Sequence, residues 1–175
     1  MANRKAIREL QSRLAERMQA VRTEQPGVSW LAVECAGQGL LFALRQAGEI
    51  FDVGAVLPVP HTQRWVVGVA NLRGGLHAVV DLACFLGLRP APLSGPAREQ
   101  AQLVLLGAAS GVNCALLVDR LEGLRHAADM QRDTTQALAR PGFAGPRWCD
   151  GAGRTWQEIE LAELALQPSF LAIAG

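Results

Sequence analysis

The sequence contains no tyrosine, and aromatic residues of all kinds make up only 5% of its 175 residues. Because proteins that bind single-stranded nucleic acid stack bases on aromatic side chains, this scarcity disfavours a base-stacking platform. The formal net charge is only +1, with 17 basic and 16 acidic residues. Surfaces that bind phosphate backbones usually carry a basic excess, so an extensive nucleic-acid interface is disfavoured as well.

Cysteine and histidine are also sparse, and neither forms a cluster. No C-x-x-C or H-x-x-x-H pair occurs, so the spacing supports neither a zinc site nor a disulfide framework. A G-x-x-x-x-G-K-[ST] phosphate-binding loop is missing too. We therefore expect no metal and no cofactor. The residues concerned are Cys35, Cys84, Cys114, Cys149, His61, His77 and His126.

No apolar run approaches the roughly 18 residues of a membrane-spanning helix. The Arg- and Glu-rich N-terminal region shows no apolar core of a secretory signal. We therefore expect a cytoplasmic protein of a reducing compartment, without direct membrane insertion. Half of the residues are hydrophobic, which is enough to build one full domain or two small subdomains that share a core.

Short apolar segments separated by turn residues recur along the chain and predict a mainly β fold made of small barrels. Residues 30–36 and 39–44 form a predicted hairpin. Two nearly continuous apolar runs, 102–106 and 113–119, are typical of strands buried on both sides. Arg147–Asp150 and Thr155–Leu161 predict a last hairpin.

Other segments predict helices and loops. Residues 3–22 have the periodicity of an amphipathic helix, which lies either on the protein's own core or on a partner. Asp81 is a predicted cap for a short helix that ends near Leu86. The Pro- and Gly-rich residues 89–97 predict a surface loop that separates two halves, and 125–146 also predict a loop. Two short helices are expected at 161–166 and 168–173.

The stretch from Trp65 to Leu82 is the most informative one. Two apolar segments flank the corner Asn71-Leu-Arg-Gly-Gly75, and a Gly-Gly pair provides the positive φ values that a tight hairpin needs. Arg73 is therefore expected at or beside the turn, on a short rigid ribbon. A permanently charged guanidinium in this position suits recognition of a partner better than catalysis.

The same stretch resembles a known family. Gly68-Val-Ala-Asn-Leu-Arg-Gly-Gly75, preceded by Pro58-Val-Pro60 and followed by a Val-Val-Asp-Leu strand, is similar to the central signature of CheW-like chemotaxis coupling proteins. The Glu49-Ile50 step and the segments 115–119 and 156–161 extend the resemblance over residues 28–166. The N-terminal helix and the tail at 166–171 are most similar to the PilI-type branch, which serves type IV pilus (twitching) systems.

The resemblance implies a fold and a function. The fold would be two SH3-like five-stranded β-barrel subdomains over residues 28–166, with a helical extension at 1–27 and a helical tail at 167–175. The function would be that of a non-catalytic adaptor. It would couple the cytoplasmic tip of methyl-accepting chemoreceptors to the regulatory domain of a CheA-type histidine kinase, at receptor arrays.

The resemblance also implies site residues. It assigns receptor contact to Arg73 and Glu49, together with Asn71 and Gly68, while Gly74 and Gly75 form the turn. Ala47-Gly48 replace the larger pair that the family usually has before Glu49, which affects the shape of any groove there.

Three alternatives remain open. The first is a CheW-like localisation scaffold that does not control a kinase, and the second is a small nucleic-acid-binding barrel. The third is an enzyme that uses His77, Asp81 and Cys84. On a strand, however, His77 and Asp81 would stand about 13 Å apart, and Asp81 is better explained as a helix cap.

Overall fold

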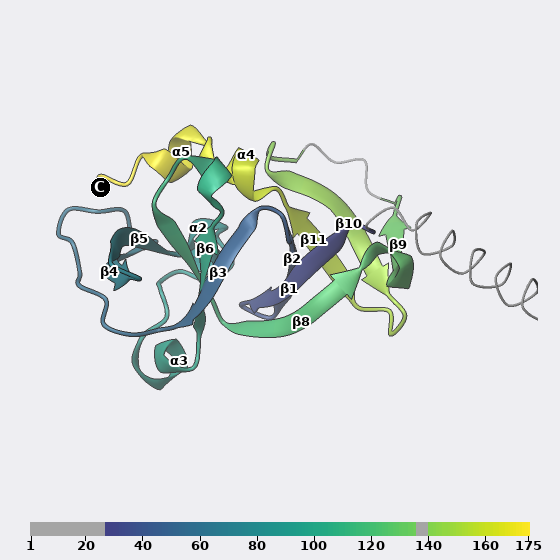
Figure 1. Ribbon diagram of the computed structural model, residues 1–175, viewed down its shortest axis with the longest axis horizontal. Coiled ribbons are helices and arrows are strands. Elements are labelled where there is room, and N and C mark those ends of the chain that lie inside the picture. Colours follow the sequence, from purple (N-terminus) through teal and green to yellow (C-terminus); the bar gives the residue numbers. More distant parts are fainter. Residues whose placement is uncertain (1–26, 136–139) are drawn as a thin grey trace, which may run out of the picture.

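A computed structural model describes residues 27–135 and 140–175. The described chain contains mainly strands and a few short helices (Figure 1). The strands are β1 (Ser29–Cys35), β2 (Gln38–Ala43), β3 (Ala47–Asp52), β4 (Val66–Leu72), β5 (Gly75–Asp81), β6 (Gln102–Leu106), β7 (Cys114–Val118), β8 (Arg120–His126), β9 (Met130–Asp133), β10 (Ala144–Asp150) and β11 (Thr155–Ile159). The helices are α2 (Leu82–Phe85), α3 (Gly95–Glu99), α4 (Leu161–Ala165) and α5 (Pro168–Leu171), with 3₁₀ turns η1 (Ala108–Ser110) and η2 (Ala127–Asp129).

The strands form two sheets that lie side by side (Figure 1). One sheet has six strands in the order β8-β1-β2-β11-β10-β9, and the other has five in the order β3-β6-β7-β5-β4. The described part of the chain begins in the six-stranded sheet, builds the whole five-stranded sheet, and returns to the first sheet at β8. Most neighbours are antiparallel, but β2 pairs with β11 and β5 pairs with β7 in parallel. The mainly β prediction is thus confirmed, although one sheet has six strands rather than five.

Three apolar clusters explain how both sheets are stabilised. Because side chains of a strand alternate between its faces, β1 sends Leu31 and Val33 into a shared core between the sheets and Trp30 and Ala32 into a second cluster. Strand β7 likewise contributes Leu116 to the shared core and its neighbours to a third cluster within the five-stranded sheet. Strands that are buried on both faces have continuous apolar runs. The predicted runs at 102–106 and 113–119 correspond to β6 and β7.

A buried ionic network fixes the passage from one sheet to the other. Asp81 is fully buried at the end of β5, and its Oδ1 accepts from the backbone of Cys84 at 2.9 Å, capping α2 as the sequence predicts. The same oxygen accepts from Arg89 Nε at 3.0 Å, and Oδ2 accepts from the backbone of Leu93 at 2.8 Å. Arg89 also pairs with Asp119, which stands between β7 and β8.

The electrostatics of Arg89 follow from this position. Burial alone would lower the pKa of its guanidinium, but hydrogen bonds and charge contacts with Asp119 and Asp81 hold the pKa above its ordinary value. Asp119 in turn accepts from the backbone of Ala36, in the β1–β2 turn of the other sheet, at 2.8 Å. The network therefore connects the two sheets through the residues at their crossing.

Two segments of the chain differ from what the sequence predicts. Residues 89–97 do not separate two halves, because they lie between α2 and β6, inside the part of the chain that builds the five-stranded sheet. Residues 125–146 are not a loop, since they contain the end of β8, all of β9 and the start of β10. These strand segments were not predicted because their side chains are mostly polar and half-exposed. The short C-terminal helices are confirmed, whereas the predicted helix at 3–22 lies outside the described residues.

We expect Arg89→Ala to lower the free energy of unfolding by about 3–5 kcal/mol, because it leaves the carboxylate of Asp81 buried without its cation. Arg98→Ala on the exposed helix α3 should change the stability by less than about 0.5 kcal/mol, since no buried group depends on that arginine within residues 27–135 and 140–175. Urea unfolding of both variants measures the difference. Equal stabilities would show that the network contributes nothing.

Candidate functional site

The turn between β4 and β5 presents Arg73. Leu72 pairs with Gly75, so Arg73 and Gly74 form a two-residue loop. Both loop residues have positive φ, 50° at Arg73 and 81° at Gly74, the pattern of a tight hairpin turn. Gly74 thus provides one of the two positive φ values, as expected of the Gly74-Gly75 pair, but the other falls on Arg73 and not on Gly75. Asn71 Oδ1 accepts from the backbone of Gly74 at 2.9 Å and stabilises this loop.

Arg73 is an unusual residue for this position. A non-glycine residue in the left-handed region costs on the order of 1 kcal/mol, and glycine would avoid that cost. The guanidinium gains little burial in return, because 73% of the side chain remains exposed. The loop therefore holds the arginine outward in a conformation that its own packing does not explain.

Glu49 reaches the turn from β3. The register of β3 against β6 shifts between Ala47 and Ile50, a bulge that changes the direction of the side chains there. A Cβ on Gly48 would come within 3.0 Å of Leu105 Cβ and 3.1 Å of its carbonyl oxygen. Gly48 therefore lets the bulged strand pack closely on β6.

An ion pair joins these two positions. Arg73 Nε lies 2.7 Å from Glu49 Oε2. Because β3 is one edge strand of the five-stranded sheet and the β4–β5 hairpin is at the opposite edge, the contact shows that the sheet curls until its edges approach. Both side chains are substantially exposed, and exposed ion pairs contribute about 0–1 kcal/mol. The structure thus brings together two residues that the sequence predicted separately.

The other predicted residues have structural explanations. Gly68 has φ 148° at a bulge in β4, and a Cβ there would lie 2.1 Å from the carbonyl oxygen of Leu57. Leu57 and Val69 exchange two backbone hydrogen bonds of 2.8 Å, so Gly68 allows the segment before β4 to cover this strand. Asn71 supports the turn as described above. Receptor contact by Gly68 or Asn71 remains a prediction.

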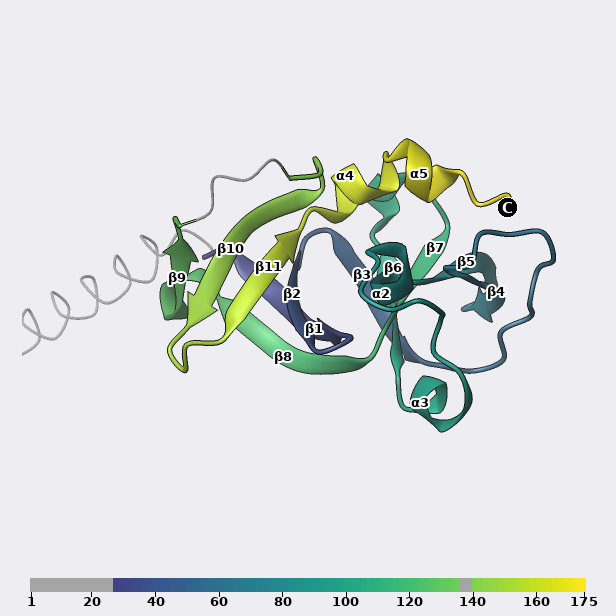
Figure 2. The same ribbon diagram turned by 180° about the vertical axis from the view of Figure 1, so that it is seen from behind.

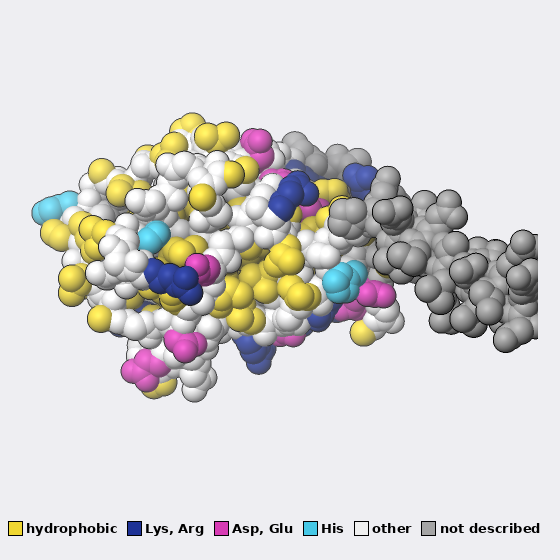
Figure 3. Space-filling view, viewed as in Figure 1, with side chains coloured by type: hydrophobic (Ala, Val, Ile, Leu, Met, Phe, Trp, Pro, Cys, Tyr) yellow, Lys and Arg dark blue, Asp and Glu magenta, His cyan; other side chains and the backbone are white. Residues whose placement is uncertain are grey.

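Apolar side chains adjoin the ion pair. Figure 3 shows apolar groups gathered where β3, β1 and β8 lie in Figure 1, beside a neighbouring pair of basic and acidic groups. Large apolar residues in or next to these strands that are at least 40% exposed include Leu44, Ile50 and Leu124. We call Arg73, Glu49, Leu44, Ile50 and Leu124 the Arg73 surface. The three apolar members were not predicted as site residues, because single exposed leucines and isoleucines carry no distinctive sequence signal.

The His77, Asp81 and Cys84 combination is not assembled as a reactive centre. His77 Nδ1 lies 2.9 Å from the carbonyl oxygen of Gly75 in the same strand, β5. Asp81 is fully engaged by Arg89 and two backbone amides. Burial raises the pKa of the Cys84 thiol, and the charge of Asp81 raises it further, so Cys84 is held as the poorly nucleophilic thiol. Among the described residues, no group of three His, Cys, Asp or Glu could hold a metal ion.

Comparison with known proteins shows the family to which the chain belongs. A family model described as CheW-like domain matches residues 29–165. The chain belongs to the CheW-like family. It is 31% identical over 114 residues to Protein PilI of Pseudomonas aeruginosa, covering 65% of the chain and 61% of PilI. It is also 29% identical over 112 residues to Chemotaxis protein CheW of Thermotoga maritima, covering 64% of the chain and 70% of that protein.

The fold agrees with this assignment. The crystal structure of scaffolding protein TtCheW from Thermoanaerobacter tengcongensis superposes with a TM-score of 0.66, covering 84% of this chain and 97% of that one, at 14% sequence identity. The resemblance predicted from the sequence is therefore confirmed for family and fold. The chain spans about three-fifths of the length of PilI. No helix among the described residues is long and apolar enough to cross a membrane.

Two glycine-to-alanine variants separate the effect of the close backbone approach at Gly68 from the effect of a positive φ alone. Gly68→Ala introduces both an unfavourable φ and a backbone clash, and we expect it to lower the free energy of unfolding by roughly 2–4 kcal/mol. Gly37 has a positive φ as well, but a Cβ at that position would meet nothing within 4 Å, so Gly37→Ala should cost only about 1 kcal/mol. Thermal or urea unfolding measures both. Equal losses would mean that the close approach of Leu57 is unimportant.

The cysteines should differ sharply in reactivity. Burial raises the pKa of Cys114 to about 12 and that of Cys35 still further above its ordinary value, and Cys84 is shifted in the same direction. At pH 8 these three groups are protonated, while Cys149 is partly exposed. Alkylation of the folded protein followed by peptide mapping should therefore modify Cys149 first. Fast labelling of Cys84 at pH 8 would revive the enzyme hypothesis.

Proposed function

We propose that this CheW-like protein is a non-catalytic adaptor. In this proposal it couples methyl-accepting chemoreceptors to a CheA-type histidine kinase in a chemotaxis or type IV pilus signalling pathway. The single observation that carries the proposal is the Arg73–Glu49 contact beside exposed apolar side chains. The names of the relatives, Protein PilI and Chemotaxis protein CheW, support the pathway.

The Arg73 surface has the parts that helix recognition requires. An amphipathic helix binds a groove through apolar side chains spaced along one face, and charged groups at the rim fix its register. Leu44, Ile50 and Leu124 provide the apolar contact, and Arg73 and Glu49 provide one charge of each sign. In the proposal, the helical cytoplasmic tip of a receptor lies on this surface.

The weakness of the ion pair fits this role. Its partners are exposed, so separating them costs little, and each can form a new pair with an opposite charge on the receptor. The turn and the bulge hold the two backbones in place throughout. Docking therefore exchanges one ion pair for two, with little conformational change. A second surface of the adaptor then engages the kinase regulatory domain, and the whole complex collects at membrane-associated receptor arrays.

Arg73→Glu tests the proposal directly. The substitution places two carboxylates side by side and removes the cation, so we expect binding to a soluble receptor signalling fragment to weaken at least tenfold, which corresponds to about 1.4 kcal/mol. Co-sedimentation or titration calorimetry with the receptor fragment and kinase of the source organism measures this. Unchanged binding would refute the proposal.

Two further variants separate function from stability. Arg73→Gly relieves the positive φ, so its unfolding free energy should equal that of the natural protein or exceed it by up to about 1 kcal/mol while receptor binding is lost. The exchange Arg73→Glu with Glu49→Arg restores the internal ion pair but reverses both charges, and it should not restore binding. A kinase-activity assay with receptor, kinase and adaptor distinguishes kinase control from mere localisation.

A further inference from the structure

A cleft lies on the face of the molecule opposite the Arg73 surface. It has a volume of about 840 Å³ and opens between the two sheets where α2, β10 and β11 face the viewer in Figure 2. Its walls come from distant parts of the chain, with Trp65 and α2 on one side and residues of β2, β10 and β11 on the other. No residue of the Arg73 surface lines it.

The floor of the cleft is aromatic and firmly packed. The ring of Phe85 meets Trp65 edge-on at 5.2 Å and Phe170 of α5 at 5.2 Å, and it lies 6.3 Å from Phe143. Trp65 stacks on Phe170 at 6.0 Å. Phe85 itself is only partly buried, so part of its ring faces the opening. Preformed aromatic clefts of this size are typical of binding sites.

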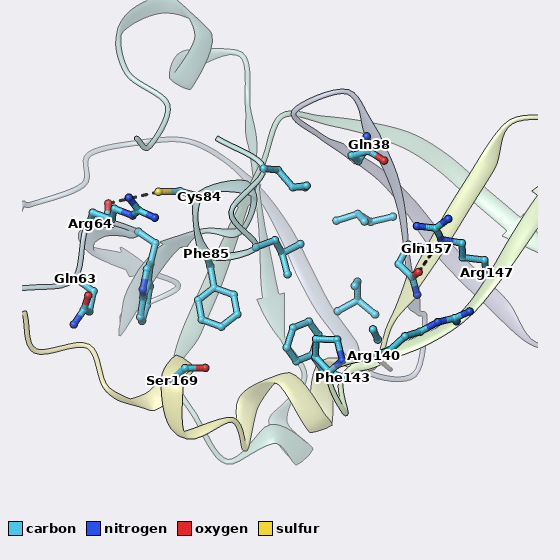
Figure 4. A pocket seen from close by; sticks show the side chains of 17 residues that line it. Gln38, Gln63, Arg64, Cys84, Phe85, Arg140, Phe143, Arg147, Gln157 and Ser169 are labelled. Carbon is cyan, nitrogen blue, oxygen red and sulfur yellow. Dashed lines mark hydrogen bonds between the residues drawn. The ribbon is translucent and has the colours of Figure 1, made fainter. Parts of the chain in front are cut away.

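The rim of the cleft carries charge of one sign. Figure 4 shows Arg64 at one end and Arg140 and Arg147 at the other, with Phe85 and Phe143 between them. Within the described part of the chain, the residues that line the cleft include no Asp or Glu. Arg147 donates to the side chain of Gln157 at 3.2 Å, and Arg140 donates to the backbone of Gly145 at 3.0 Å, which orients both guanidinium groups. On the Arg73 surface, by contrast, a carboxylate accompanies the cation.

We propose that this cleft binds a short amphipathic segment of a partner protein, with apolar anchors in its middle and acidic residues at both ends. The apolar anchors cover Phe85 and Phe143, and the terminal carboxylates pair with Arg64 and Arg147. Tryptophan and arginine are also the residue types that most often dominate binding energy at protein interfaces. The site is independent of the proposed receptor surface.

The charge of the cleft argues against an occupant from the protein itself. Residues 1–26 contain six Lys or Arg and three Glu, a net charge of +3, so they would be repelled by the arginines of the rim. A segment of the opposite charge meets the same rim favourably. We therefore assign the cleft to a segment of another protein and not to residues 1–26.

A random peptide library displayed on phage and sorted on the full chain tests the proposal. We expect the enriched peptides to contain Leu, Phe or Trp flanked by Asp or Glu, and synthetic copies to protect residues 82–88 and 140–147 from hydrogen exchange. Affinity should fall at least tenfold for Arg64→Glu combined with Arg147→Glu. Both side chains reach solvent, so the double variant should fold.

Two controls make the result specific. Arg98→Glu reverses a charge on α3, away from the cleft, and should leave the affinity within about twofold of the natural protein. Arg73→Glu should do the same, which separates this site from the proposed receptor surface. The proposal is overturned if the enriched peptides lack acidic residues, bind the double variant equally well, or are displaced by a synthetic peptide of residues 1–26.

Discussion

The buried contact of Asp81 with Arg89, and of Arg89 with Asp119, governs the rest of the architecture. A carboxylate in the interior requires a cation and hydrogen-bond donors, and α2, Arg89 and the backbone of Leu93 supply them. Through Asp119 the same network reaches the β1–β2 turn. Burial of one charge therefore fixes the end of β5 and the start of α2 together, and through Asp119 the crossing into β8 as well.

The proposed receptor surface combines a rigid backbone with a weak side-chain contact. The positive φ of Arg73 and the bulge of β3 place both charged residues at the rim, and backbone geometry of this kind changes little on binding. The ion pair itself is exposed and contributes little to folding. A strong internal pair would compete with a partner, whereas a weak one keeps the side chains oriented and available.

Local patterns predicted the parts of the fold that depend on neighbouring residues. The hairpin of β1 and β2, the buried strands β6 and β7, and the cap at Asp81 each follow from a few adjacent positions. The return of the chain into the first sheet does not, because the parallel pairing of β2 with β11 joins residues more than a hundred positions apart. The family signature predicted Arg73 and Glu49 as site residues, but not the contact between them. The cleft was not predicted, because Trp65, Phe85 and Phe143 come together only in the folded chain.

The two faces also bear on how the proposed adaptor would transmit a signal. Coupling between distant sites requires an element with two arrangements that both sites influence. Here a shared core lies between the sheets, and Asp119, which pairs with Arg89, accepts from the backbone of Ala36 in the other sheet. Rotation of the sheets would break this contact between Asp119 and Ala36. Such an arrangement resists a second conformation. We therefore infer that, in the proposed adaptor role, the molecule holds its proposed partners at a fixed distance and orientation, and that occupation of one face leaves the affinity of the other unchanged.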